Sequence, residues 1–244
     1  MSIAIAVAVA LVAGTVSGLT GFGFVLVSVT PLLLLFAPAT VVPVALMLNF
    51  LVSAVVAAEA RGAVAWRTVL ALLPPACAGL YLGALALRAL DAPALKLVVS
   101  VVVAGFALLL LTGLRLPRAH SPWATAVAGL TSGALTTTTG LSGPPIVALF
   151  AGREYAPQPF RASAAAFFLP LDLFGLAALI AQDGVHRAEW TLALTLAPAA
   201  LLGTALGRQA ARRISVALFR QVVLGLLLLT GVVGALTTLT ALVR

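Results

Sequence analysis

The sequence predicts an all-α integral membrane protein that crosses the bilayer several times. Hydrophobic residues make up 63% of the 244 positions and charged residues only 8%, and the mean hydropathy is +1.22. Soluble domains carry about a quarter charged residues, so this chain needs lipid as its solvent. Its apolar runs are continuous and do not alternate with period two, which favours helices over a lipid-spanning barrel.

Apolar stretches follow one another along the chain and are separated by short polar or Gly/Pro-rich gaps. They cover residues 3–36, 40–58, 68–87, 94–113, 123–152, 162–181, 190–207 and 216–243. Most have the length of one membrane-spanning helix, about 20 residues. The first and the fifth are too long for one helix. Glycines interrupt the first between positions 14 and 23, and Pro144-Pro145 interrupts the fifth, since both prolines lack the N–H donor and clash with the preceding turn of a helix.

The chain is predicted to consist of two homologous halves, with a first repeat at 1–114, a connecting loop at 115–122 and a second repeat at 123–244. A shift of 190 − 66 = 124 positions aligns Trp66 with Trp190, Pro74 with Pro198, Gly79 with Gly203, Gly83 with Gly207, Arg88 with Arg212 and Lys96 with Arg220. Earlier in each half, Gly14-x-x-Ser17-Gly18 matches Gly129-x-x-Ser132-Gly133, and Phe36-Ala37-Pro38 matches Tyr155-Ala156-Pro157. The insertion between these two anchors falls at Thr136–Thr139. Each half therefore contains an interrupted segment, which a re-entrant hairpin would explain, followed by three transmembrane helices.

Duplicated membrane proteins with an interrupted segment in each half are typical secondary transporters, and the interruptions indicate the binding site. A helix that restarts after such a turn directs unpaired N–H groups and its positive dipole end toward the turn, which favours a small anion. The predicted substrate is therefore a small oxyanion. The predicted substrate-binding residues in these turns are Gly18, Gly21, Gly23, Thr138, Thr139, Gly140, Ser142 and Gly143. Gly79, Gly83, Gly203 and Gly207 are instead expected to let helices pack closely.

Ionisable and amide residues within or next to the apolar stretches are further candidates. Asp172 lies in an apolar segment, where a carboxylate is costly and marks a functional site by default. It is expected to carry a proton, or else to pair with a cation such as Arg161 or to cap an irregular helix near Pro170. Asn49, near the equivalent position in the first half, is either a helix–helix hydrogen bonder or a substrate ligand. Arg161 either draws the anion inward or sets topology.

Other functional classes find no support in the sequence. His120 and His186 lie far from any cluster with metal-ligand spacing, so no metal is expected. A phosphate-binding loop is missing, so ATP is not the expected driving force, and no catalytic constellation or cofactor site is visible. The net charge of +8 is dispersed over the gaps, as topology determinants are, so nucleic-acid binding is not expected.

The two glycine-rich motifs resemble those of the TauE/SafE family of sulfite and organosulfonate exporters. They are Gly14-x-x-Ser17-Gly18-Leu-Thr-Gly21-Phe-Gly23 and Thr139-Gly140-Leu-Ser142-Gly143-Pro144-Pro145. The resemblance covers nearly the whole chain and implies transport of a small sulfur-containing anion, such as sulfite, across the bacterial cytoplasmic (inner) membrane, with proton coupling through Asp172 as an option. An anion channel and a non-transporting membrane subunit stay open as alternatives, as do a homo-oligomer and the sidedness of the halves.

Overall fold

The computed structural model describes residues 2–89, 119–139, 142–181 and 185–215, together with the single residues 218, 221, 222 and 225. This part of the chain is helical, as predicted. The elements are α1 (Ser2–Thr20), α2 (Phe24–Leu33), α3 (Pro38–Glu59), the 3-10 turn η1 (Arg61–Ala63), α4 (Trp66–Ala89), α6 (Pro122–Thr139), α7 (Gly143–Gly152), α8 (Pro157–Ile180) and α9 (Arg187–Ala211). Within the described residues, five helices are long and apolar enough to cross a membrane: α1, α3, α4, α8 and α9.

Both interrupted stretches divide into a long helix followed by a helix of 10 residues. The stretch 3–36 forms α1 and α2, and the stretch 123–152 forms α6 and α7. The break after α1 occurs where Gly21 and Gly23 adopt φ values of 82° and 95°, which glycine adopts at no steric cost. The predicted stretch 94–113 and nearly all of 216–243 lie outside the described residues.

The helix boundaries of the two interrupted stretches differ by one constant offset. The end of α1 and α6, the start of α2 and α7, and the start of α3 and α8 give 139 − 20, 143 − 24 and 157 − 38, which all equal 119. The sequence alignment of Gly14 with Gly129 has an offset of 129 − 14 = 115 and places an insertion at Thr136–Thr139. This offset differs from that of the helix ends by four residues, which is about one helical turn. Small residues spaced by four lie on the same helix face, so the motif can be aligned equally well one turn earlier or later.

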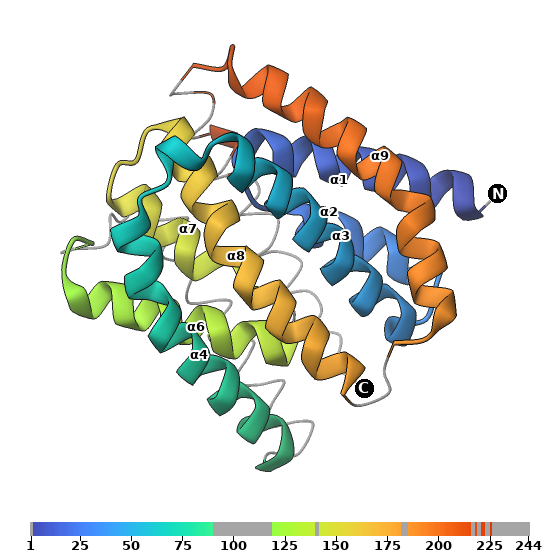
Figure 1. Cartoon of the computed structure of the whole chain (residues 1–244), viewed down its shortest axis with the longest axis horizontal. Helices are drawn as coiled ribbons and strands as arrows, with labels where there is room; N and C mark the ends of the chain where they lie inside the picture. Colours follow the sequence, from blue (N-terminus) through green and yellow to red (C-terminus); the bar gives the residue numbers. More distant parts are fainter. Residues whose placement is uncertain are drawn as a thin grey trace. The chain divides into compact units, whose positions relative to one another are not determined.

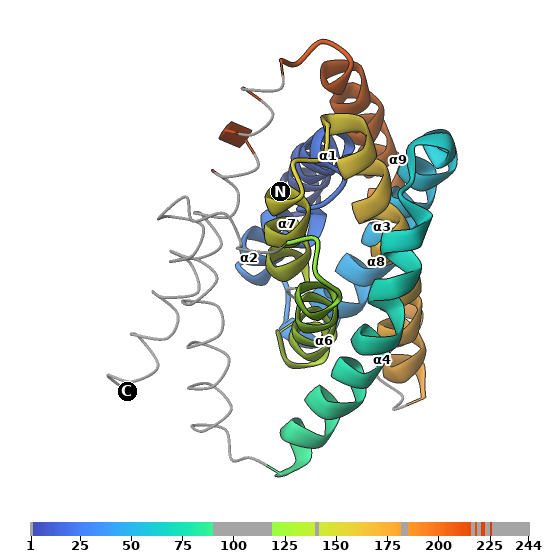
Figure 2. The same cartoon turned by 90° about the vertical axis from the view of Figure 1, so that its left-hand side faces the viewer.

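The chain forms two compact units, and each contains residues from both sequence halves. Unit 1 consists of residues 1–69 and 156–219, and unit 2 of residues 70–155 and 220–244. In unit 1, α1 packs along α9, and α3 packs against α8 and α9; Figure 1 shows α1 in blue alongside α9 in orange. The same neighbours are visible after a quarter turn (Figure 2). In unit 2, α6 contacts α7.

The contacts within unit 1 fix the directions of its long helices. Gly14 faces the backbone of Ala200 and Gly18 that of Thr204, so α1 and α9 run parallel. Leu46 lies at Gly175, Asn49 at Asp172 and Glu59 at Arg161, so α3 and α8 run antiparallel. Thr40 bonds Glu189 while Glu59 pairs with Arg208, so α3 also runs parallel to α9. The end of α3, the start of α8 and the end of α9 therefore meet at one end of unit 1.

Close glycine contacts hold the parallel helix pairs together in each unit. In unit 1, Gly203 and Gly207 of α9 face the backbone at Leu11 and Thr15 of α1, and a Cβ on either glycine would overlap it. In unit 2, Gly79 and Gly83 of α4 face Leu130 and Ala134 of α6 in the same way. The predicted packing role of these four glycines is confirmed. The contacted positions again differ by 119, since 130 − 11 and 134 − 15 give that value.

Candidate functional site: an arginine pocket in unit 1

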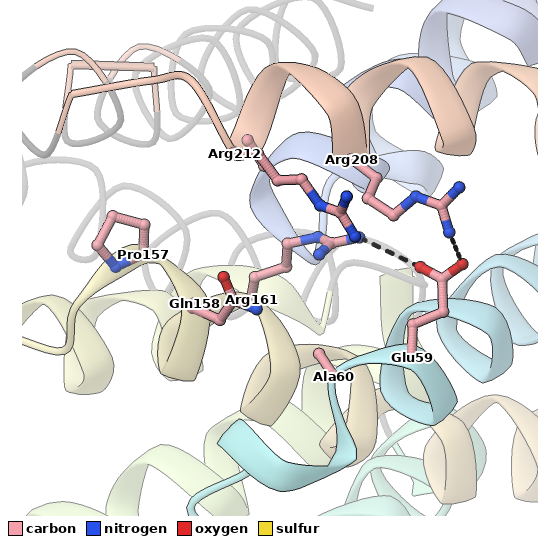
Figure 3. A pocket seen from close by; sticks show the side chains of 8 residues that line it. Glu59, Ala60, Pro157, Gln158, Arg161, Arg208 and Arg212 are labelled. Atoms are coloured by element: carbon pink, nitrogen blue, oxygen red, sulfur yellow. Dashed lines mark hydrogen bonds and ion pairs between the residues drawn. The ribbon is translucent and has the colours of Figure 1, made fainter.

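A pocket of about 230 Å³ lies at the end of unit 1 where α3 ends, α8 begins and α9 ends. We call it the arginine pocket. It is lined by Glu59, Ala60, Pro157, Gln158, Arg161, Arg208, Ala211 and Arg212. Three arginines and one glutamate give the lining a formal net charge of +2. In Figure 3 the arginine side chains extend from α8 and α9 toward Glu59. The lining therefore favours a small anion.

Arg161 is the most deeply placed charge of the arginine pocket. The residue is only 5% exposed. Among the described residues, neither its Nε nor its Nη2 has a hydrogen-bond partner. Its Nη2 lies 4.0 Å from Oε2 of Glu59, which is an ion pair beyond hydrogen-bond length. A buried guanidinium with unused donors is costly unless another group compensates it. The unused donors of Arg161 are thus available to a ligand in the pocket.

The other charges of the arginine pocket are more accessible to water. Arg208 donates through Nη1 to Oε1 of Glu59 in a direct ion pair, and both side chains are about one-third exposed, at 36% and 32%. Arg212 is exposed, and its positive charge repels the positive charge of Arg161. Figure 3 shows Glu59 with an ion pair to Arg208 and another to Arg161. A single carboxylate thus serves two of the three cations.

The first glycine turn supports the backbone of Arg161. A Cβ on Gly21 would lie 2.6 Å from Cα of Arg161 and would overlap its carbonyl group. Gly21 also has φ of 82°, where an L side chain is strained. Beside this contact, the rings of Phe22 and Phe160 lie 6.1 Å apart. The turn therefore fixes the position of Arg161, although Gly18, Gly21 and Gly23 do not line the arginine pocket.

Asn49 and Asp172 form a second buried polar pair in unit 1. Nδ2 of Asn49 donates to Oδ2 of Asp172 across 2.7 Å, and the two residues are 6% and 3% exposed. The partner of Asp172 at this oxygen is thus Asn49 on α3, not Arg161, whose ion pair is with Glu59. Pro170 lies inside α8, which continues to Ile180, so Asp172 is not a cap at this proline. Neither residue lines the arginine pocket.

The second glycine turn lies in unit 2, between α6 and α7. Ser142 is the N-cap of α7, its side chain makes no capping bond, and its carbonyl accepts a 2.6 Å hydrogen bond from Oγ of Ser132. Helix initiation leaves four N–H groups without intrahelical partners, but Pro144 and Pro145 at the start of α7 have none to offer. The backbone of this turn therefore presents fewer donors than the sequence suggests. Gly140 and the side chains of Thr138 and Thr139 lie outside the described residues.

Of the predicted substrate-binding residues that the structure describes, Arg161 alone lines the arginine pocket. Sequence reasoning missed Glu59, Arg208 and Arg212. These residues sit at helix ends, where charged residues commonly set topology, and they come together only through the packing of α3, α8 and α9. One signal was present in the sequence: Glu59 is one of only six acidic residues and directly follows an apolar stretch.

The arginine pocket has the chemistry of an oxyanion site. Guanidinium groups present planar sets of N–H donors that match sulfonate and carboxylate oxygens. Within the described residues, no group of three or more His, Cys, Asp and Glu side chains could hold a metal ion.

Comparison with known proteins agrees with this chemistry. The profile of the family described as sulfite exporter TauE/SafE matches residues 6–234 of the chain. No curated protein and no solved structure is significantly similar to it. The match covers nearly the whole sequence. A membrane transporter family agrees with the five apolar, membrane-length helices among the described residues. The chain belongs to the sulfite exporter TauE/SafE family.

Proposed function

We propose that the chain is a secondary transporter that exports a small sulfur-containing oxyanion, such as sulfite or an organosulfonate, across the bacterial cytoplasmic membrane. We further propose that the arginine pocket binds this anion. The observation that carries the proposal is the pairing of Arg161, buried and with unused donors, with Arg208 and Arg212 in one pocket. The family supports the same substrate class.

The negative charge of an oxyanion would compensate the formal net charge of +2 in the lining of the arginine pocket. Hydrogen bonds between a guanidinium and an anionic oxygen are shorter and about twice as strong as neutral ones. Sulfite and sulfonates carry three oxygens on one sulfur, so a single anion can accept from two arginines at once. The space of about 230 Å³ suits a small anion and not a bulky one.

We propose that the two halves are inverted repeats. Supporting this, α3 and α8 begin at prolines with the same offset of 157 − 38 = 119 and each follows a 10-residue helix, yet they run antiparallel in unit 1. If a helix and its equivalent in the other half run in opposite directions, each half must cross the membrane an odd number of times. The return of the chain through α2, between the parallel helices α1 and α3, supplies the odd crossing. Inverted repeats are common in secondary transporters.

The arginine pocket is proposed to face the cytoplasm. Short cytoplasmic loops are enriched in Lys and Arg. The described residues at the pocket end of unit 1 include six arginines and one glutamate: Arg61, Arg67, Arg161, Arg208, Arg212, Arg213 and Glu59. At the opposite end, the described link between α8 and α9 contributes Arg187 and Glu189. A cytoplasmic pocket is where an exporter must collect its anion.

Proton coupling is proposed to use Asp172. It is a carboxyl group buried inside a membrane-length helix, and such groups occur in proton relays of transporters. Asn49, which holds it, is neutral, so no cation compensates a charge on Asp172 through this bond.

The direct test is transport by the purified full chain in proteoliposomes loaded with sulfite, sulfoacetate, thiosulfate or sulfate, each with and without a pH gradient. We expect sulfite or sulfoacetate to leave the vesicles faster than from protein-free liposomes, and a pH gradient to change the rate. Failure of all four anions to move would disprove the proposed substrate class.

A further inference from the structure

Glu59 occupies an unusual position for an acidic residue. It is the last residue of α3, and a negative charge at a helix C-terminus is unfavourable because it lies at the negative end of the helix dipole. Glu59 nevertheless lies in the arginine pocket, with Arg208 in direct contact and Arg161 4.0 Å away. Its location therefore follows from the arginines and not from the stability of α3.

The carboxylate of Glu59 is chemically similar to the proposed substrate. It is a small oxyanion, and it uses the same guanidinium donors that a sulfite or sulfonate would use. Its pairing is also incomplete, since Nε and Nη2 of Arg161 have no hydrogen-bond partner among the described residues. The Glu59 carboxylate thus pairs directly with Arg208 and only at a distance with Arg161. An anion that accepts hydrogen bonds from both arginines would bind there more tightly than Glu59 does.

We propose that Glu59 is an internal competing anion, which pairs with the arginines while the arginine pocket is empty and is displaced when the transported oxyanion binds. This inference rests on the proposed function of the pocket and adds a release step to it. A sulfur oxyanion that binds to Arg161 and Arg208 displaces Glu59 from its ion pair. When Glu59 returns to Arg208, it weakens the hold on the substrate and favours release. Glu59 is one-third exposed at 32%, so its side chain has solvent to move into.

The test compares sulfite binding to the full chain and three variants by isothermal titration calorimetry in chloride-free buffer, with transport measured in parallel. Glu59→Gln removes the competing charge, and Glu59→Asp keeps the charge on a shorter side chain that reaches Arg208 poorly. Glu154→Gln is the matched control, because Glu154 is an exposed glutamate in unit 2 outside the pocket lining.

We expect Glu59→Gln to lower the apparent Kd for sulfite about fivefold, the scale of releasing one partly exposed ion pair. Glu59→Asp should fall between the wild type and Glu59→Gln, whereas Glu154→Gln should match the wild type. In transport, Glu59→Gln should lower both KM and the maximal rate, since binding becomes tighter and release slower.

Two outcomes would overturn the inference alone. In the first, the wild type binds and transports sulfite but Glu59→Gln binds it no more tightly. In the second, Glu59→Asp binds like the wild type, so that only the net charge of the pocket matters and not occupation of Arg208. If neither the wild type nor any variant binds or moves a sulfur oxyanion, the proposed function itself fails. A melting curve of each variant shows whether it is folded before binding is compared.

Discussion

Arg161 is buried, and its Nε and Nη2 have no hydrogen-bond partner in the part of the chain that the structure describes, which is expected of a residue kept for binding and not for stability. Its backbone is fixed by the close approach of Gly21, so the guanidinium cannot withdraw by shifting the start of α8. Removing a buried cation with unused donors relieves a desolvation cost. Function and stability should therefore respond in opposite directions at this position.

We predict that Arg161→Gln raises the KM for sulfite at least about tenfold, because hydrogen bonds to charged groups are worth about 1.5–3 kcal/mol and about 1.4 kcal/mol is a factor of ten. The melting temperature should stay unchanged or rise. Arg161→Lys, which keeps the charge but not the planar fork, should have an intermediate KM. Arg213→Gln removes an exposed arginine next to the pocket and should transport like the wild type. Equal KM values for the Gln variants at 161 and 213 would refute a binding role for Arg161.

The pair of Asn49 and Asp172 yields a second prediction at this scale. Asp172→Asn can still accept the hydrogen bond from Asn49, so it should fold normally. Asp172→Ala leaves the buried Asn49 amide without this acceptor, which costs about 1–3 kcal/mol. Denaturation in detergent should rank the alanine variant well below the asparagine variant. If Asp172 carries the proton, anion flux through Asp172→Asn in proteoliposomes should no longer respond to a pH gradient. Persistent pH-dependent flux would assign coupling to another group.

Individual residues also show what the sequence could and could not reveal. Asp172 was recognisable because a charge inside an apolar stretch is rare, and Arg161 because it directly precedes that stretch. Glu59 and Arg208 were not, because 208 − 59 = 149 positions separate them and each looks like an ordinary charge at the end of a helix. Only the directions of α3 and α9 bring the two together. A pattern in one sequence specifies which residues are unusual, whereas the packing of helices decides which of them meet.

At the level of elements, the structure depends on parallel helices whose backbones nearly touch. Glycine spacing along α9 was sufficient to predict a packing role, since a period of four keeps one face. The same periodicity hid the register between the proposed halves, because a shift of one turn preserves the glycine pattern. In the sequence, the offset of 119 is visible only where Phe36-Ala37-Pro38 matches Tyr155-Ala156-Pro157. The helix ends extend it over the interrupted stretches, because they depend on turns such as Gly21–Gly23 that have no periodicity.

We predict that Gly203→Ala separates α1 from α9 and lowers stability by about 1–3 kcal/mol, the range for overpacking a close contact. A Cβ at this position would lie 2.8 Å from the backbone nitrogen of Thr15 and 2.9 Å from the carbonyl carbon of Leu11. Neither atom belongs to a flexible side chain that could turn aside. Thermal unfolding in detergent, followed by circular dichroism, would measure the loss.

Gly175→Ala provides the matched control on α8. A Cβ there meets only side-chain atoms of Leu46, at 3.5 Å or more, which is ordinary contact. Alanine is the better helix former by about 1 kcal/mol, so this variant should be as stable as the wild type or slightly more so. Equal destabilisation by both substitutions would mean that the contact between α1 and α9 is not the limiting one.

For the whole molecule, the decisive property is the relation between its two proposed halves. The sequence indicated a duplication and left parallel and inverted arrangements open, because hydropathy gives the stretches but not the directions of neighbouring helices. The directions come from contacts far apart in the chain, such as Asn49 with Asp172. Together with the offset of 119, these contacts place the link between α3 and α4 and the link between α8 and α9 at opposite ends of unit 1.

We predict that these two links lie on opposite sides of the membrane. Gly62, where an added side chain meets no atom within 4 Å, and Ala188, which is exposed, are suitable sites for single cysteines in a Cys77→Ser background, which removes the native thiol. In intact cells, a membrane-impermeant maleimide should label Ala188→Cys and spare Gly62→Cys, and inverted vesicles should give the reverse. This result would place the arginine pocket, which lies beside Gly62 at the end of α3, on the cytoplasmic side. Labelling of both cysteines from the same side would refute the inverted arrangement, and labelling of Gly62→Cys from outside would place the pocket where an exporter releases its anion.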